Sequence, residues 1–112
     1  DPGITEYTGE VTVSQNARSS MVSFDWRIPA KSLMKTSTFK VQKGQEILVS
    51  VLSTSSQTYD MGIINSAGTK RYVVATGSKG YNFEITQTGY YSVFIRNSGS
   101  TAINVSGSYA VY

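Results

Sequence analysis

The sequence predicts an all-β fold, an antiparallel β-sandwich or jelly roll of about eight or nine strands. Three observations predict this fold class. Segments in which apolar and polar residues alternate follow one another along the chain, as expected for strands with one buried face. Residues typical of turns separate these segments at a spacing of roughly ten residues, which favours a sandwich over a βαβ fold. No segment longer than one turn has the apolar spacing of a helix.

The length and composition indicate one domain that spans residues 1–112. The chain has no cysteine and no histidine, which excludes disulfides, thiolate metal sites and the commonest general base. Its net charge of +3 is a mild basic bias, too small to predict nucleic-acid binding. No apolar run approaches the roughly 20 residues of a transmembrane helix.

In the N-terminal part, residues 1–7 resemble a lead-in, because Pro2 and Gly3 disfavour regular structure. Residues 8–15 form the first predicted strand, at the edge of a sheet. Residues 19–28 form a longer strand, and Pro29 ends it. Alternation along this strand predicts four core residues, namely Val22, Phe24, Trp26 and Ile28.

The middle of the chain begins with residues 31–35, which are compatible with one short helical turn. Strands are predicted at 36–41 and 46–53, with a turn around Gly44 between them. The strand at 46–53 also carries Leu48 and Leu52 on its second face. We therefore expect a central strand that is covered on both sides.

The next two strands, residues 59–64 and 70–75, are predicted to form a hairpin. The segment 65–68, Asn-Ser-Ala-Gly, supplies its turn. A polar loop at 76–80 leads to a further strand at 81–85, where Tyr81, Phe83 and Ile85 alternate with polar residues.

The strongest strand signal covers residues 89–97. Tyr91, Val93 and Ile95 form a fully apolar face, while Ser92 and Arg96 belong to a mixed one, which predicts a central strand. Turn residues follow at 97–101. Residues 102–112 then alternate again, and we expect them to pair with 89–97 in a C-terminal hairpin.

The apolar residues from Phe39 onward follow a further pattern. The spacing Phe-x-Val-x-x-Gly-x-x-Ile-x-Val-x-Val from Phe39, Tyr-x-Phe-x-Ile from Tyr81 and Gly-x-Tyr-x-Val-x-Ile from Gly89 resembles the bacterial pre-peptidase C-terminal family of β-sandwich modules. The resemblance implies a secreted, non-catalytic accessory or substrate-binding domain. This chain lacks the acidic cluster that binds calcium in related collagen-binding modules, so we transfer no residue's role.

Motifs that indicate catalysis are absent or lack their context. Ser32 and Lys35 match the Ser-x-x-Lys spacing of penicillin-recognising enzymes, but the supporting motifs are missing. The acidic residues are scattered, and only a calcium site formed across several loops remains compatible with them. We expect neither enzymatic activity nor a cofactor.

These observations together favour a small secreted or cell-surface bacterial protein with a binding or surface-structural role. A carbohydrate or cell-envelope polymer is the favoured ligand. The alternative is a protein–protein module, such as an inhibitor, a toxin-like effector or a self-assembling subunit, in which an exposed strand edge pairs with a partner. The sequence predicts no nucleic-acid partner, and it leaves the oligomeric state open.

Three polar loops, 54–58, 76–80 and 97–101, are the candidate binding elements. If strands from residue 46 onward run alternately up and down, all three loops lie at one end of the sandwich. That arrangement predicts six ligand-binding residues on one rim: Gln57, Tyr59, Lys79, Tyr81, Arg96 and Asn97. Four further tyrosines are expected to be exposed: Tyr7, Tyr72, Tyr90 and Tyr112.

Overall fold

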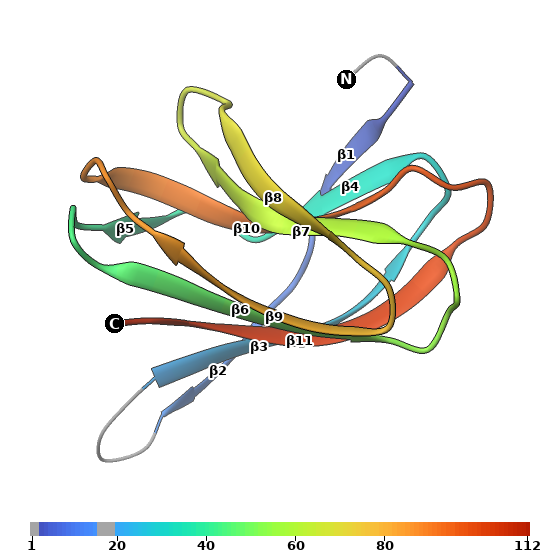
Figure 1. Cartoon of the computed structure of the whole chain (residues 1–112), viewed down its shortest axis with the longest axis horizontal. Coiled ribbons are helices and arrows are strands. Elements are labelled where there is room, and N and C mark those ends of the chain that lie inside the picture. The colour runs from blue at the N-terminus through green and yellow to red at the C-terminus, as the bar shows by residue number, and fades with distance from the viewer. Residues whose placement is uncertain (1–2, 16–19) are drawn as a thin grey trace.

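A computed structural model describes residues 3–15 and 20–112, and in it two β-sheets pack face to face (Figure 1). The six-stranded sheet has the order β1 (Thr5–Thr8), β4 (Ser32–Lys35), β10 (Gly89–Asn97), β7 (Tyr59–Asn65) and β8 (Lys70–Ala75), with β5 (Phe39–Val41) also paired to β10. The five-stranded sheet has the order β2 (Thr12–Gln15), β3 (Ser20–Ile28), β11 (Ile103–Val111), β6 (Glu46–Ser53) and β9 (Ser78–Glu84). The predicted all-β sandwich is confirmed, with more strands than the sequence indicates.

The core between the sheets follows from the alternation along each strand. Phe24 and Trp26 of β3 are buried and their rings stack with centroids 4.1 Å apart. The Trp26 indole donates a hydrogen bond to the Glu10 carbonyl, so its polar atom is satisfied. Gly107 of β11 lies in register with Phe24, and a Cβ there would come within 2.6 Å of the Phe24 ring. A side chain at this position would therefore displace a core aromatic.

The strand β10 is central, as predicted, since it pairs with β4 and β5 on one side and with β7 on the other. Tyr91, Val93 and Ile95 face the core. The opposite face of β10 differs from the expectation, because Phe94 and Arg96 are buried there as well. From Tyr91 to Asn97 this strand is covered on both faces, while Tyr90 stays exposed.

The predicted C-terminal hairpin is wrong. β11 does not pair with β10 but lies in the other sheet, between β3 and β6. The connection at 98–102 therefore crosses from one layer to the other. The crossing lets the apolar residues of both strands face the same core from opposite sides.

Two N-terminal predictions are also wrong. The lead-in contains β1, which pairs in parallel with β4 along Thr5–Thr8. Residues 32–35 form this strand β4 rather than a helical turn. Lys31 has a positive φ of 55°, so the chain turns sharply just before β4. Pairing with β10 buries Leu33, and this non-local contact outweighs the weak local signal.

Three boundaries or faces require correction. The predicted strand 8–15 is interrupted, and only β2 at its end lies at the edge of the five-stranded sheet, as expected for an edge strand. The predicted loop 76–80 ends earlier, because β9 begins at Ser78. β6 is not covered on both sides, since Leu52 is 52% exposed. Ser19 of the second predicted strand lies outside the described residues.

Candidate functional site

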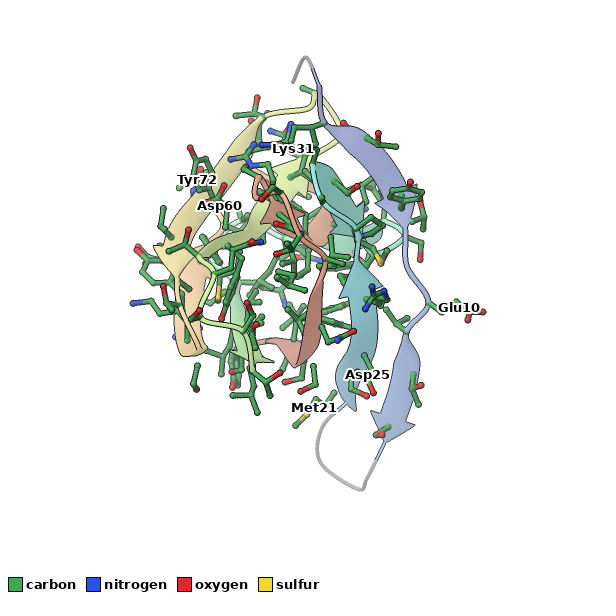
Figure 2. All side chains as sticks on the ribbon, turned by 90° about the vertical axis from the view of Figure 1, so that its right-hand side faces the viewer. Glu10, Met21, Asp25, Lys31, Asp60 and Tyr72 are labelled. Carbon is green, nitrogen blue, oxygen red and sulfur yellow. The ribbon has the colours of Figure 1, made fainter. Side chains whose placement is uncertain are left out.

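Four connections meet at one end of the sandwich, which faces the viewer in Figure 2. We call this end the rim and define it as residues 29–31, 54–58, 76–77 and 98–102. Backbone hydrogen bonds join its parts: Ser53 N–H donates to Gly77 O over 3.1 Å, and Lys31 N–H donates to Gly99 O over 3.2 Å. The three polar loops of the sequence prediction do share one end, and the second, predicted at 76–80, is shorter than expected because β9 begins at Ser78.

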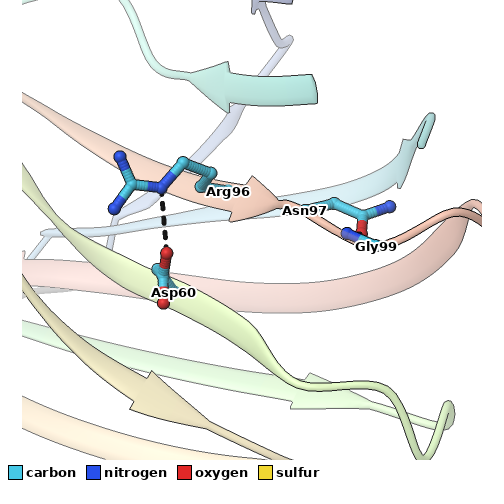
Figure 3. A network of polar contacts seen from close by, with 4 residues as sticks. All are labelled: Asp60, Arg96, Asn97 and Gly99. Carbon is cyan, nitrogen blue, oxygen red and sulfur yellow. Dashed lines mark hydrogen bonds and ion pairs between the residues drawn. The ribbon is translucent and has the colours of Figure 1, made fainter. Parts of the chain in front are cut away.

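Asn97 lies inside the rim and is fully buried. Its side-chain NH₂ donates to the carbonyl oxygens of Ile28, Pro29 and Thr101 over 3.1, 3.1 and 2.9 Å. Its Oδ1 accepts from the Gly99 N–H over 3.0 Å, at the position seen in Figure 3. Asn97 therefore holds two connections together and is not available to a ligand in this conformation.

Gln57 is half-buried beside Asn97, and its amide donates to Asn97 Oδ1. Its Oε1 accepts from the Thr101 hydroxyl over 2.9 Å, which attaches the 54–58 loop to the 98–102 connection. Gly99 packs directly on this amide, since a Cβ at Gly99 would overlap it. Gln57 therefore mainly stabilises the rim, by hydrogen bonds to Asn97 and Thr101.

Tyr59 does not supply the exposed aromatic that the sequence predicts. It is only 2% exposed, and its hydroxyl donates to Gly77 O over 2.6 Å. Burial raises the pKa of Tyr59 above its ordinary value. Lys79 and Tyr81 are exposed but lie on β9, at the edge of the five-stranded sheet. Among the six predicted residues, Gln57 and Asn97 are in direct contact through a hydrogen bond.

Arg96 belongs to a second group of side chains, next to the rim on the outer face of the six-stranded sheet. Its Nε donates to Asp60 Oδ2 over 2.9 Å, the contact that is dashed in Figure 3. Its guanidinium carbon lies 4.7 Å from the centroid of the Tyr72 ring and 5.7 Å from that of Phe94. We call these four residues the Arg96 cluster.

Gly62 explains why the rings of the Arg96 cluster meet. It lies in register between Phe94 of β10 and Tyr72 of β8, on the same face of the sheet. A Cβ at Gly62 would come within 2.6 Å of the Tyr72 Cβ, so only glycine leaves room for this approach. The ring centroids of Tyr72 and Phe94 are 6.3 Å apart. Phe94 is fully buried as a result, although it faces outward.

Tyr72 remains 47% exposed above Arg96, and Val74 beside it is 63% exposed. Val74 is paired with Asp60 and lies two residues before the rim. The arrangement thus offers an exposed aromatic with a fixed position and an aliphatic neighbour. Sequence analysis identifies Tyr72 as exposed but misses its contact with Arg96, because that contact depends on the pairing of β8, β7 and β10. The glycine inside the apolar strand 59–64 is the signal that would have indicated a close approach.

The described residues give no indication of metal chemistry. Among residues 3–15 and 20–112, no group of three or more acidic side chains lies close enough to hold a metal ion. In the same residues, no helix is long and apolar enough to cross a membrane. The tyrosine pKa values shifted by burial belong to Tyr59 and Tyr109, which face the interior.

No protein-family model matches the chain, and no curated protein matches its sequence. Solved structures do match its fold. A periplasmic inhibitor of g-type lysozyme from Aeromonas hydrophila has a TM-score of 0.68 at 10% identity, with 97% of each chain covered. The pre-peptidase C-terminal domain of a Bacillus anthracis collagenase has a TM-score of 0.54 at 14% identity, with 97% of this chain and 94% of that chain covered. This match confirms the predicted resemblance in fold.

A third match is a protein of the disulfide-linked pili known as Bacillus endospore appendages. Its TM-score is 0.55 at 13% identity, with 93% of this chain and 90% of that chain covered. At such low identity the three matches establish the fold alone. They are small β-sandwich proteins with periplasmic or extracellular settings.

Proposed function

We propose that this protein is a non-catalytic module, secreted or located in the cell envelope, that binds a partner protein through the rim and Tyr72. The observation that carries the proposal is the exposed Tyr72 ring, held in place by Arg96, which is in turn held by Asp60. Tyrosine and arginine are the residue types that most often dominate the binding energy of protein interfaces.

The fixed position of Tyr72 favours binding because little freedom is left to lose. A side chain that is already ordered by a cation–π contact loses less conformational entropy when a partner packs on it. The exposed Val74 extends the apolar contact area next to it. Tyr72 and Val74 thus resemble the apolar core of a protein interface, which polar residues usually surround.

The rim supplies such a polar margin. Its exposed residues include Ser98, Ser100 and Thr101, and Lys31 is fixed by donating from its Nζ to Ser98 O over 2.7 Å. The buried Asn97 amide holds these connections together by donating hydrogen bonds to the carbonyl oxygens of Ile28 and Thr101. Loops held rigidly by a β-scaffold are a common basis of recognition.

Polysaccharide binding, the ligand class favoured by the sequence, receives less support. Of the two tyrosines predicted for the rim, Tyr59 is buried, and Tyr81 is exposed but lies on the edge strand β9, so the two do not form one aromatic platform for a sugar. The names of two fold neighbours, a lysozyme inhibitor and a pilus protein, describe protein contacts. They support the alternative of a protein–protein module over the carbohydrate reading. A disulfide-linked assembly is not available to these residues, since none is cysteine.

Binding measurements with two matched tyrosine variants test the proposal. The purified chain is presented to a g-type lysozyme, the partner named for the Aeromonas protein, and separately to insoluble cell-wall polysaccharide. We expect lysozyme binding that weakens about tenfold or more in Tyr72→Ala. Tyr90→Ala is the control, because Tyr90 is 52% exposed on the same face but pairs with Lys40, away from the rim. Retention by polysaccharide without lysozyme binding, or equal losses in both variants, would contradict the proposal.

A further inference from the structure

The strand β8 forms one edge of the six-stranded sheet, and its open side pairs with no described strand. Figure 2 shows it as the pale yellow strand on the left-hand side of the molecule, near the labels of Tyr72 and Asp60. The second half of β8, residues 72–75, carries no charged side chain. An edge of this kind presents unpaired backbone groups and can act as a template for a further strand.

The register of the β7–β8 pair shows which backbone groups of β8 are open. The Asn65 N–H donates to Thr69 O over 3.0 Å, and hydrogen-bonded pairs alternate with non-bonded pairs along antiparallel strands. Arg71, Val73 and Ala75 are therefore the residues of β8 that bond to β7. The residues whose N–H and C=O groups point away from β7, toward the open side, are Lys70, Tyr72 and Val74.

The neighbouring edge, the strand β9 of the other sheet, is less open. The Ile85 N–H donates to Gln45 O over 2.9 Å, and by the same alternation the Glu84 carbonyl points away from β6. The Arg71 guanidinium donates to this carbonyl, and its carbon lies 5.9 Å from the centroid of the Phe83 ring. Arg71 thus caps part of the β9 edge. In residues 3–15 and 20–112, no side chain caps the open groups of β8 in this way.

The side chains of β8 combine positive charge with exposed apolar area. Tyr72 and Val74 are exposed on the outer face of the sheet. Lys70 faces outward in register with Ile64, and it makes no ion pair with any described residue. Arg71 beside it bonds to a carbonyl oxygen rather than to a carboxylate. β8 therefore carries two positive charges that no acidic side chain in the described part of the chain neutralises by an ion pair.

The acidic groups on the same outer face are already paired. Asp60 accepts a hydrogen bond from Arg96, and Glu6 Oε1 lies 3.5 Å from the Lys35 Nζ. Lys40, exposed on β5, adds a further positive charge. Along the described strands the outward charges of this face are Lys35, Lys40, Lys70 and Arg96 against Glu6 and Asp60. The excess of positive charge next to the open edge favours an acidic partner.

We propose that an extended acidic segment of the partner protein adds to β8 as a further strand of the six-stranded sheet. The proposal rests on the proposed function, because Tyr72 belongs to both contacts. The open N–H and C=O groups match the backbone of a polypeptide and neither a polysaccharide nor a lipid headgroup. Alternate side chains of the added strand then lie beside Lys70, Tyr72 and Val74. The segment therefore carries an acidic residue and, at every second position after it, two apolar residues, in either direction along the chain.

Selection from a phage-displayed library of random linear peptides tests the chemistry of the added strand. On the purified wild-type chain we expect enrichment of peptides with this alternating acidic and apolar pattern. Lys70→Glu should weaken the binding of such a peptide about tenfold or more and should select lysine or arginine in place of the acidic residue. Lys43→Glu is the matched control, because Lys43 is exposed in the turn between β5 and β6 and should leave the selected pattern unchanged. Enrichment of no peptide, or of clustered acidic residues without alternation, would overturn the proposal.

Backbone methylation of a selected peptide tests the addition of a strand itself. Only alternate N–H groups of an added strand face β8, so two peptides are made that each carry one N-methyl group, at adjacent central residues. We expect one of them to bind about tenfold or more weakly than the unmethylated peptide and the other to bind nearly as well. Equal losses in the two peptides, or no loss in either, would rule out strand addition.

A proline in β8 makes the same test on the protein. The Val74 N–H points to the open side, so Val74→Pro removes an open donor and keeps the hydrogen bonds to β7. We expect a circular dichroism spectrum like that of the wild type and loss of peptide binding; if this variant unfolds, the methylated peptides decide. Peptide binding that requires Tyr72 but is insensitive to methylation and to Val74→Pro would refute strand addition and leave the proposed function standing. Peptide and lysozyme binding that are both unchanged in Tyr72→Ala would refute the proposed function itself.

Discussion

Asn97 illustrates how far a single side chain can reach in this fold. Its position in a polar turn predicts an exposed ligand-binding residue, because asparagine is frequent in turns and offers both donors and acceptors. In the structure it is buried and bonded to the carbonyls of Ile28 and Pro29, 69 and 68 residues away along the chain. Sequence patterns of period two report which face a residue is on but not which distant carbonyls it meets.

Replacing Asn97 should therefore affect stability as well as binding. Asn97→Ala leaves several buried carbonyl oxygens without a donor, and we expect the free energy of unfolding to fall by about 3 kcal/mol. Urea denaturation measures this change. Asn104→Ala is the control, since Asn104 is exposed on β11, and its variant should unfold like the wild type. An Asn97→Ala chain of unchanged stability would show that the buried amide does not brace the rim.

Two buried tyrosines make stability depend on alkaline pH. Burial raises the pKa of Tyr59 and of Tyr109 above the ordinary value of 10.0, so both stay protonated longer in the folded chain than in the unfolded one. Their contribution is complete below about pH 10 and is lost as pH rises further, because the unfolded chain ionises first.

We expect the free energy of unfolding to decrease above about pH 10, and Tyr59→Phe to reduce this decrease. Chemical denaturation at a series of pH values measures both. The phenylalanine variant also loses the hydrogen bond to Gly77 O, so its stability at neutral pH serves as the reference. A pH profile that is identical in Tyr59→Phe would argue against the buried phenol as a cause.

Among the elements, β10 shows what local pattern predicts and what it misses. Its bounds and its core face follow from alternation and from the glycine and asparagine at its ends. Its second face is buried because Tyr72 and Arg96 cover Phe94, and both contacts depend on tertiary structure. The hairpin of β7 and β8 is also predicted well, because the residues of its turn are neighbours in the sequence.

The doubly covered β10 leads to a prediction about its outward face. Phe94→Ala should lower the free energy of unfolding by about 3 to 5 kcal/mol, as in a core position, because the removed ring leaves a cavity. Tyr91→Ala should cost a comparable amount from the inner face. Tyr90→Ala, at an exposed site, should cost clearly less. Thermal and urea denaturation of the three variants provide the comparison, and a Phe94→Ala loss as small as that of Tyr90→Ala would contradict the observed covering.

Sequence patterns do not predict three features of the fold: the strand β4, the strand β1 and the place of β11 in the five-stranded sheet. The short strand β4 has too few residues for a clear alternation, and β1 forms through a parallel pairing that no local turn specifies. The turn residues at 98–101 suit a hairpin and a crossover between sheets equally well. The location of β11 in the other sheet is decided by the packing of Ile103, Val105 and Tyr109 on the core.

At the scale of the whole molecule, the sandwich presents two unlike outer surfaces. One has the Arg96 cluster beside a braced rim, with exposed Tyr72 and Val74. The other is the outer face of the five-stranded sheet, where small residues such as Ser50 lie among the exposed charges of Asp25, Arg27 and Glu84. The prediction that the polar loops share an end is correct because antiparallel neighbours alternate in direction. The exposure of individual rim residues is harder to predict, since it depends on side-chain hydrogen bonds across several loops, as for Tyr59 and Asn97.

Amide hydrogen exchange tests the central claim, that the rim and Tyr72 form the protein-binding surface, most directly. Exchange is measured by mass spectrometry for the chain alone and for the chain saturated with a g-type lysozyme. The account predicts slower exchange in bound samples at residues 70–75 and 98–102, with residues 46–53 of β6 in the five-stranded sheet unchanged. Slower exchange confined to 46–53, or no change at the rim in a saturated complex, would contradict it.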